Sequence, residues 1–186
     1  MPFLKNIIIN DQTKIKIWKV TLGELSHNEL NNEDKKLLKK KRSDLLREQF
    51  LATRKMLALE NSDYKITYDL VGKPNLNNEY NISISHSHEL VAFVISDNCK
   101  AGIDVQLKEI KILNIQNKFL NKFEKFNIGE DPSIDILTMI WASKESIYKA
   151  IGIKGISFSE NIKIDGVVEK DKTGQGYYIN GAEKLK

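Results

Sequence analysis

Hydrophobic and polar residues follow regular patterns along most of the chain, and these patterns predict its secondary structure. Residues 14–20 alternate lysine with apolar residues at period two, which is typical of a half-buried strand. Leu90–Ser96 is a continuous apolar run and predicts a strand that is buried on both faces. Between about 32 and 60, leucines recur at helical spacings opposite a basic face, which predicts an amphipathic helix or a broken pair of helices. Further strands are expected at residues 7–9, 64–70, 81–85, 101–106, 153–164 and 177–179.

Caps and turn residues divide the remaining sequence. Residues 113–127 predict a helix. Asp131 as a cap, with Pro132 at the first helical position, predicts another helix that runs to about Ile151 and ends at Gly152. The expected turns and loops are at 71–74, extended by Asn75, Asn77 and Asn78, at Asp97-Asn98, and between Gly174 and Gly176. Helices and strands mix without strict βαβ alternation, so the predicted fold class is α+β.

The composition limits the class of protein. The chain has 186 residues, 41% hydrophobic and 29% charged, which suits one soluble globular domain or two small halves sharing a core. No apolar run is long enough to cross a bilayer, and the N-terminus lacks the apolar core of a secretory signal. Cys99 is the only cysteine, which excludes an intrachain disulfide and zinc sites built from several cysteines. We therefore expect a cytoplasmic protein without a membrane partner.

A formal net charge of +4 favours an anionic ligand or an acidic partner. Much of the positive charge lies in one stretch, and such a run is usually a solvated helix face. A nucleic-acid footprint is the alternative, but no aromatic residue interleaves the run before Phe50 and no DNA-reading motif is present, so nucleic acid is not expected. The run comprises Lys35, Lys36, Lys39, Lys40, Lys41, Arg42, Arg47, Arg54 and Lys55.

Two acidic positions could carry metal chemistry. In the strand expected at 101–106, Asp104 and Gln106 would share one face. A carboxylate within an apolar segment needs neutralising, by a divalent cation for example, unless it lies exposed on an edge strand. Trp141, Glu145 and Lys149 lie at successive i,i+4 positions of the last helix. They are either a surface Glu–Lys pair beside a core tryptophan, or a magnesium-binding carboxylate beside a phosphate-binding cation.

Ser85 and His86 follow a short predicted strand, where a hydroxyl and an imidazole could both donate to a phosphate. His86 and His88 could instead bind a metal, but no third soft ligand is nearby, and a structural role is the usual alternative for such histidines. Lys73, in the Gly72-Lys73-Pro74 turn, could also reach an anionic ligand.

The order of these motifs resembles that of the 4'-phosphopantetheinyl transferase superfamily, over about residues 47–155. The motifs are Gly72-Lys73-Pro74, Ile84-Ser85-His86-Ser87, Gly102-Ile103-Asp104 and Trp141-x-x-Lys144-Glu145-x-x-x-Lys149. Their arrangement in one chain is similar to the surfactin-synthetase-type class, in which two similar α+β halves pack as a pseudo-dimer. The resemblance implies a monomer with a basic, coenzyme-A-binding half at 1–100 and a metal-binding half at 101–186.

The resemblance also implies roles for individual residues. Asp104 and Glu145 would bind Mg²⁺, or alternatively Mn²⁺, with Gln106 as a further ligand, and Glu145 would be the general base. Lys149 would contact the phosphates of coenzyme A and assist the leaving group. The other implied coenzyme A residues are Ser85 and His86 at the phosphates, Lys73 near the adenosine, and Arg47 and Arg54 at the 3'-phosphate. Phe119 and Glu124 resemble a Phe…Glu segment between the two signatures, without an assigned role.

The implied activity is Mg²⁺-dependent transfer of 4'-phosphopantetheine from coenzyme A to a serine of an acyl or peptidyl carrier protein, with release of 3',5'-ADP. Three departures stand out: Gln106 where many members have glutamate, His88 where glycine is common, and an end at Lys186 that implies a shortened second half. The alternatives are a degenerate homologue that binds coenzyme A or a carrier protein without turnover, and a basic nucleic-acid-binding module.

Overall fold

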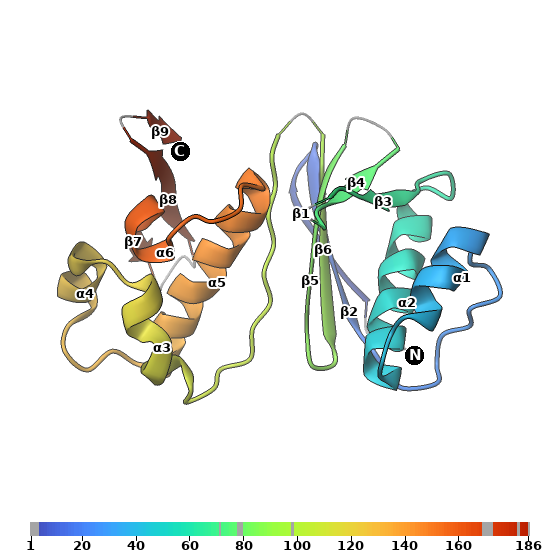
Figure 1. The fold of residues 1–186 in the computed structure, drawn as a ribbon, viewed down its shortest axis with the longest axis horizontal. Helices are drawn as coiled ribbons and strands as arrows, with labels where there is room; N and C mark the ends of the chain where they lie inside the picture. The colour runs from blue at the N-terminus through green and yellow to red at the C-terminus, as the bar shows by residue number, and fades with distance from the viewer. Residues whose placement is uncertain are drawn as a thin grey trace. The chain divides into compact units, whose positions relative to one another are not determined.

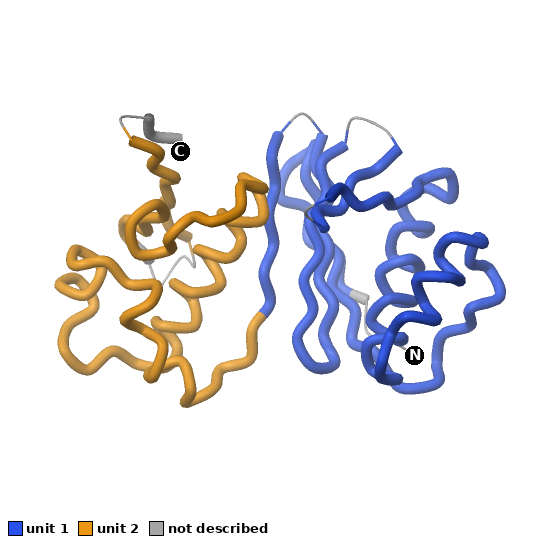
Figure 2. Tube along the Cα trace, viewed as in Figure 1, with its two compact units in different colours: residues 1–105 blue, residues 106–186 orange. Residues whose placement is uncertain are grey.

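The computed structural model describes residues 4–70, 72–77, 80–97, 99–168, 173–181 and 183–185, with the backbone alone at residues 4, 167–168 and 183–185. The chain divides into two compact units, residues 1–105 and 106–186 (Figure 2). The boundary expected from the resemblance lies at residue 100. Helices and antiparallel sheets occur in both units, which confirms the α+β class.

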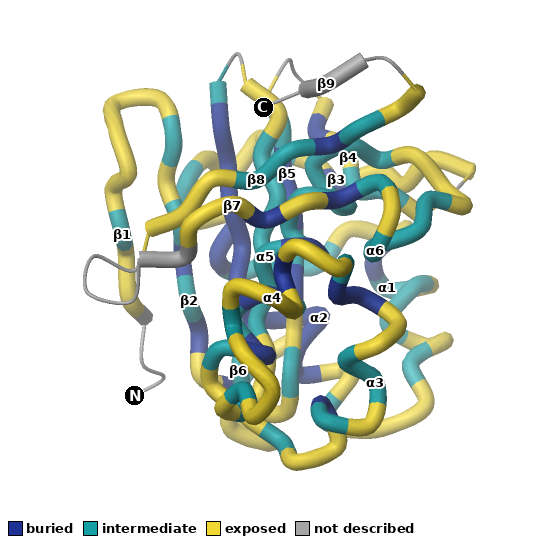
Figure 3. Tube along the Cα trace, turned by 90° about the vertical axis from the view of Figure 1, so that its left-hand side faces the viewer, coloured by how far each residue is buried: buried dark blue, intermediate teal, exposed yellow. Residues whose placement is uncertain are grey.

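Unit 1 is built on a four-stranded antiparallel sheet in the order β1-β2-β6-β5. Its central strand β6 is buried at every position after Leu90, as the continuous apolar run predicts. The edge strand β1 is mostly exposed (Figure 3). The strands are β1 (Leu4–Asn10), β2 (Thr13–Lys19), β5 (Asn81–Ser87) and β6 (Leu90–Ser96).

Two helices, α1 (Asn32–Lys39) and α2 (Asp44–Glu60), lie on one side of this sheet (Figure 1). They confirm the broken helical pair. Each helix begins at a side-chain cap: Asn31 accepts from the Asp34 N–H at 2.8 Å and Ser43 from the Leu46 N–H at 3.2 Å. The core between helices and sheet is apolar, and its fully buried members include Ala52, Met56, Val91 and Phe93.

The alternation in β2 does not place isoleucine on the core side. Lys16 and Trp18 are the buried residues of this strand, while Ile15 and Ile17 are half-buried. A buried ammonium group requires a partner, and the Lys16 Nζ lies 2.7 Å from Glu60 Oε1 at the end of α2. This ion pair lets a lysine occupy the core side of the strand.

A short hairpin of β3 (Ile66–Tyr68) and β4 (Pro74–Leu76) follows the helices, with the expected turn between its strands. Asn75 belongs to β4, where it pairs with Thr67, so its prediction as loop is wrong. Asn77 does lie outside the strand, and its side chain accepts from the Lys65 N–H at 3.0 Å. The turn and loop predictions at Val71, Asn78 and Asn98 fall outside the described residues.

The strand predicted at 101–106 is absent; this described segment has no regular secondary structure. Two of its backbone N–H groups donate to serine side chains of β5. The Ile103 N–H donates to Ser83 Oγ, and the Val105 N–H donates to Ser85 Oγ, each at 3.2 Å. Two serine hydroxyls of β5 thus hold this segment beside the strand.

Unit 2 combines helices with a three-stranded antiparallel sheet in the order β7-β8-β9. The helix predicted at 113–127 is two helices, because Asn121 caps the second one in a capping box with Glu124. The elements are α3 (Ile112–Phe119), α4 (Lys122–Ile128), α5 (Ile134–Ile151), α6 (Phe158–Asn161), β7 (Ile162–Val168), β8 (Thr173–Asn180) and β9 (Glu183–Leu185).

Helix α5 begins later than the Asp131-Pro132 pair predicts. Its cap is Ser133, whose Oγ accepts from the Ile136 N–H at 3.2 Å, so the first helical residue is Ile134. The predicted end is confirmed, because Gly152 adopts a left-handed conformation with φ of 72°.

The strand predicted at 153–164 begins only at Ile162. The residues just before it form the short helix α6 instead of strand. The side chain of Asn161, the last residue of this helix, accepts from the Ser157 N–H at 2.8 Å. Gly174 and Gly176 lie inside β8, so their prediction as turn residues is wrong. A Cβ at Gly176 would collide with Ile147 Cδ1, so this glycine permits close packing of β8 on α5.

His88, in the turn between β5 and β6, has a left-handed backbone with φ of 51°. Gln49 of α2 donates to its carbonyl at 2.6 Å and ties the turn to the helix. Because the conformation is unfavourable for a residue with a Cβ, we expect His88→Gly to raise the free energy of unfolding by about 1 kcal/mol. Urea unfolding would measure this change. His88→Ala keeps the Cβ and should bring no gain; equal stability of the Gly and Ala variants would contradict the explanation.

Candidate functional site

A hydrogen bond joins two of the sequence motifs within unit 1. Ser85 Oγ donates to Asp104 Oδ1 at 2.8 Å and accepts from the Val105 N–H. Because side chains alternate along a strand, Ser83 and Ser85 share one face of β5, and His86 points to the other. Ser85 is buried, with 5% of its surface exposed, so its hydroxyl is a fixed support for the Asp104 carboxylate.

His86 lines a cavity of about 270 Å³, which we call the His86 cavity. Three parts of unit 1 form it: helix α2 with the turn before it, the β3–β4 hairpin, and β5. The cavity therefore gathers His86 with Gly72 and Pro74, the neighbours of Lys73, and with the predicted phosphate ligand Arg54. The other residues that line it are Lys41, Leu46, Gln49, Phe50, Thr53, Tyr68 and Ile84.

Arg54 is held by a buried ion pair. Its Nε and Nη2 donate to Asp34 Oδ1 at 2.9 and 2.7 Å, and its Nη1 donates to the Tyr68 hydroxyl at 3.3 Å. The guanidinium lies over the Phe50 ring, 4.1 Å from its centroid. Burial lowers the pKa of Arg54, but the bonds to Asp34 and Tyr68 outweigh it, so the pKa lies above its ordinary value. Arg54 thus joins α1 to α2 besides lining the cavity.

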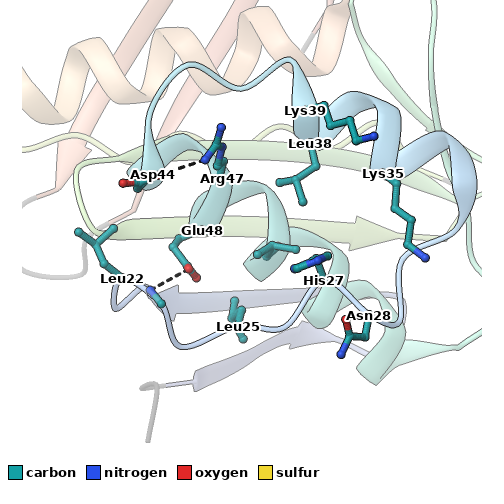
Figure 4. Close-up of a pocket in the computed structure, with 12 residues that line it drawn as sticks. Leu22, Leu25, His27, Asn28, Lys35, Leu38, Lys39, Asp44, Arg47 and Glu48 are labelled. Atoms are coloured by element: carbon teal, nitrogen blue, oxygen red, sulfur yellow. Dashed lines mark hydrogen bonds and ion pairs between the residues drawn. The ribbon is translucent and has the colours of Figure 1, made fainter.

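Arg47 does not line the His86 cavity. It lies seven residues before Arg54 on α2 and faces a second cavity of about 930 Å³ (Figure 4). We call this the β2–α1 cavity, because the loop between β2 and α1 forms one of its walls. Arg47 Nη1 lies 3.3 Å from Asp44 Oδ1, and about half of its side chain is exposed. The two arginines predicted at one phosphate therefore line different cavities.

Lys73 lies in the tight turn of the β3–β4 hairpin. Its N–H donates to Asp69 Oδ1 at 2.8 Å and its carbonyl accepts from the Asp69 N–H at 3.1 Å. Gly72 has a φ of 85°, which a residue with a side chain rarely adopts. Asp69 therefore binds both backbone groups of Lys73, one with its side chain and one with its own N–H.

The predicted metal ligands are divided between the two units. Asp104 belongs to unit 1, whereas the exposed Gln106 and the half-buried Glu145 belong to unit 2. Glu145 and Lys149 lie one turn apart on α5, as their spacing predicts. Among the described residues, no three His, Cys, Asp or Glu side chains gather as a metal cluster. The metal site stays a prediction.

Lys144, beside Glu145 in the signature, is the most buried charged residue described, with none of its surface exposed. Its Nζ donates to Glu124 Oε2 at 2.8 Å and to three backbone carbonyls, those of Phe119, Phe158 and Ile162, at 2.7 to 2.9 Å. Burial lowers the pKa of Lys144, and the hydrogen bond to Glu124 offsets part of this effect.

Glu124 completes this network. Its Oε1 accepts from the Ile164 N–H at 2.8 Å and its Oε2 from the Asn121 N–H at 2.9 Å. The Phe…Glu segment thus has a structural role that sequence reasoning did not assign. A signal was present, because Lys144 shares a helix face with the buried Leu137 and Ile140.

Comparison with models of known protein families gives no match, and no curated protein matches the chain. In the described part of the chain, no helix combines the length and apolar character needed to span a membrane.

Replacement of Lys144 should destabilise unit 2 strongly. We expect Lys144→Met to lower the free energy of unfolding by about 3–5 kcal/mol, because Glu124 would remain charged and buried without its cation. Urea unfolding followed by circular dichroism would measure this. The matched control is Lys125→Met, since Lys125 lies exposed on α4 and its side chain bonds only Asn117 among the described hydrogen bonds. A loss of less than 1 kcal/mol for Lys144→Met would contradict the role given to this network.

Proposed function

We propose that the chain is a 4'-phosphopantetheinyl transferase, which moves the 4'-phosphopantetheine group of coenzyme A to a serine of an acyl or peptidyl carrier protein. One observation carries this proposal: three motifs that are distant in the sequence converge in unit 1. Gly72 and Pro74 line one cavity with His86, and the neighbouring Ser85 binds Asp104. The proposal includes the transferase fold with two related halves, a monomeric state and a cytoplasmic location.

The His86 cavity suits the phosphoadenosine end of coenzyme A. Lys41 and Arg54 are cations and His86 carries an imidazole N–H, all of which can bind phosphate oxygens, and the three side chains line the cavity. Phe50 and Tyr68 add aromatic surface for a purine. At about 270 Å³ the cavity is smaller than pockets that enclose a drug-sized ligand, about 300–1,000 Å³. It would therefore hold the nucleotide end alone, with the pantetheine arm outside.

The predicted metal ligands fit a hard divalent cation in their chemistry. Asp104, Glu145 and Gln106 would offer oxygen atoms alone, which suits Mg²⁺ or Mn²⁺. The hydroxyl of Ser85 orients the Asp104 carboxylate, as groups behind a metal ligand commonly do. When bound, the ion would neutralise charge that grows on the pyrophosphate oxygens.

The chain's own side chains would carry the transfer. Glu145 would accept the proton of the carrier serine while the serine oxygen bonds to the β-phosphorus of coenzyme A. The bond from this phosphorus to the bridging oxygen breaks, and 3',5'-ADP leaves with the electron pair. Lys149, one helical turn from Glu145, would donate hydrogen bonds to the leaving phosphate. The alternative is a chain that binds coenzyme A or a carrier protein without turnover.

The activity can be tested by intact mass spectrometry. We expect an apo-acyl carrier protein to gain one phosphopantetheine arm when incubated with the protein, coenzyme A and Mg²⁺, and to gain none after chelation. Asp104→Ala and Glu145→Ala should each lower the rate by at least about 100-fold, because each removes a group proposed to act on the reacting phosphate or serine. Asp135→Ala, which removes an exposed carboxylate of α5, is the control and should keep the activity.

The outcomes separate the two readings of the site. Near-full activity of either site variant would show that the assignment is wrong. If the wild type modifies none of several carriers but coenzyme A raises its melting temperature, the alternative without turnover holds.

The 3'-phosphate ligand can be identified with two donors. We expect Lys41→Ala to weaken coenzyme A binding about tenfold and dephospho-coenzyme A binding much less, because Lys41 lines the His86 cavity. Arg47→Ala, measured alongside by calorimetry, tests the residue that the sequence indicates. A selective loss with Arg47→Ala alone would place the 3'-phosphate at the other cavity.

A further inference from the structure

Apart from Arg47, none of the residues that line the β2–α1 cavity has a role in the proposed transfer. Its volume of about 930 Å³ is at the upper end of the range for pockets that hold small organic ligands. Figure 4 shows its three walls: the loop after β2, helix α1 and the first turns of α2. Four leucines line it, and Leu22 among them is 62% exposed, which leaves apolar surface available to a ligand. These are Leu22, Leu25, Leu38 and Leu51.

A buried carboxylate lines the same cavity. Glu48 of α2 has only 6% of its surface exposed, and its Oε1 accepts from the Gly23 N–H at 2.9 Å. Its Oε2 is also buried, and no described group of the protein donates a hydrogen bond to it. Buried carboxylate oxygens are normally paired with donors. Glu48 therefore favours a ligand that brings an O–H or N–H group.

Two lysines of α1 line the cavity together with the leucines. Lys35 and Lys39 are four residues apart on α1, with Leu38 between them, so all three lie on the helix face that lines the cavity (Figure 4). Asp44 is already engaged with Arg47, and Glu48 is tied to Gly23. The two lysines are therefore available to an anionic group of a ligand, although their charges attract it only weakly where they are exposed to water.

We propose that the β2–α1 cavity binds an amphipathic organic anion that also carries a hydroxyl or amide N–H group. Its carboxylate or phosphate pairs with Lys35 and Lys39, its apolar chain packs on the leucines, and its O–H or N–H donates to Glu48. This site is additional to the proposed transferase site, and it holds whether or not the chain transfers phosphopantetheine. A small ligand fits better than a protein segment, because Glu48 lies buried at the wall and a compact polar group must reach it.

Calorimetry with four related compounds tests each feature of the ligand on the full chain. 3-Hydroxydecanoate has the anion, the chain and the hydroxyl, and should bind most tightly. Decanoate lacks the hydroxyl and the methyl ester of 3-hydroxydecanoate lacks the charge, so each should bind about tenfold more weakly. 3-Hydroxyhexanoate has a shorter chain, and each lost methylene should weaken binding by about fourfold where the chain is buried.

Two sets of variants connect binding to the cavity. Lys35→Met with Lys39→Met should weaken 3-hydroxydecanoate binding about tenfold. The matched control is Lys36→Met with Lys40→Met. It removes the same charge from the residues next in sequence, which do not line the cavity, and it should leave binding unchanged. Glu48→Gln keeps an acceptor for the Gly23 N–H but replaces Oε2 by an amide nitrogen, so the preference for 3-hydroxydecanoate over decanoate should be lost.

The proposal is overturned if 3-hydroxydecanoate does not bind the wild type at millimolar concentration. It is also overturned if the two lysine pairs weaken binding equally, which would mean a diffuse charge effect, or if chain length has no influence. Thermal melts of every variant separate loss of the fold from loss of the ligand. Because no variant changes a proposed transferase residue, carrier modification can be measured with the same proteins, and its failure would leave this result intact.

Discussion

Unit 2 depends on the hydrogen bonds that the fully buried ammonium group of Lys144 donates. This group bonds the end of α3, the start of α4 through Glu124, helix α6 and the first residue of β7, so four segments converge on one cation. A charge is costly to bury unless every donor is satisfied, and here the Nζ has four acceptors. The arrangement fixes the position of α5 within its unit, and Glu145 is the next residue on that helix.

Unit 1 has a comparable buried interaction, the ion pair of Arg54 and Asp34, which joins α2 to α1. Both side chains are buried, and the guanidinium also covers Phe50, so the pair fixes the distance between the two helices. That distance shapes the walls on either side of α2. The β2–α1 cavity is lined by residues of both helices, so it could not keep its form if α1 moved away, and Arg54 itself lines the His86 cavity.

Local sequence patterns predicted the elements that depend on interactions between residues close in the sequence. The apolar run of β6, the break between α1 and α2, and the glycine that ends α5 all follow from periodicity or caps within a few residues. The contact of Ser85 with Asp104 does not, because it joins residues 19 apart and Asp104 lies in a segment without regular secondary structure. The burial of Lys144 was missed for a similar reason: charge predicts exposure, and its acceptors lie on other elements.

The basic run also shows why composition could not choose a partner. Within 20 residues its cations lie in three different surroundings. Lys35 and Lys39 line the β2–α1 cavity, Lys41 lines the His86 cavity, and Arg54 forms an ion pair with Asp34. A helix turns by about 100° per residue, so neighbours in such a run face different surroundings. The net charge is therefore not the charge of one surface, and each cation has to be interpreted with the acid, ring or cavity beside it.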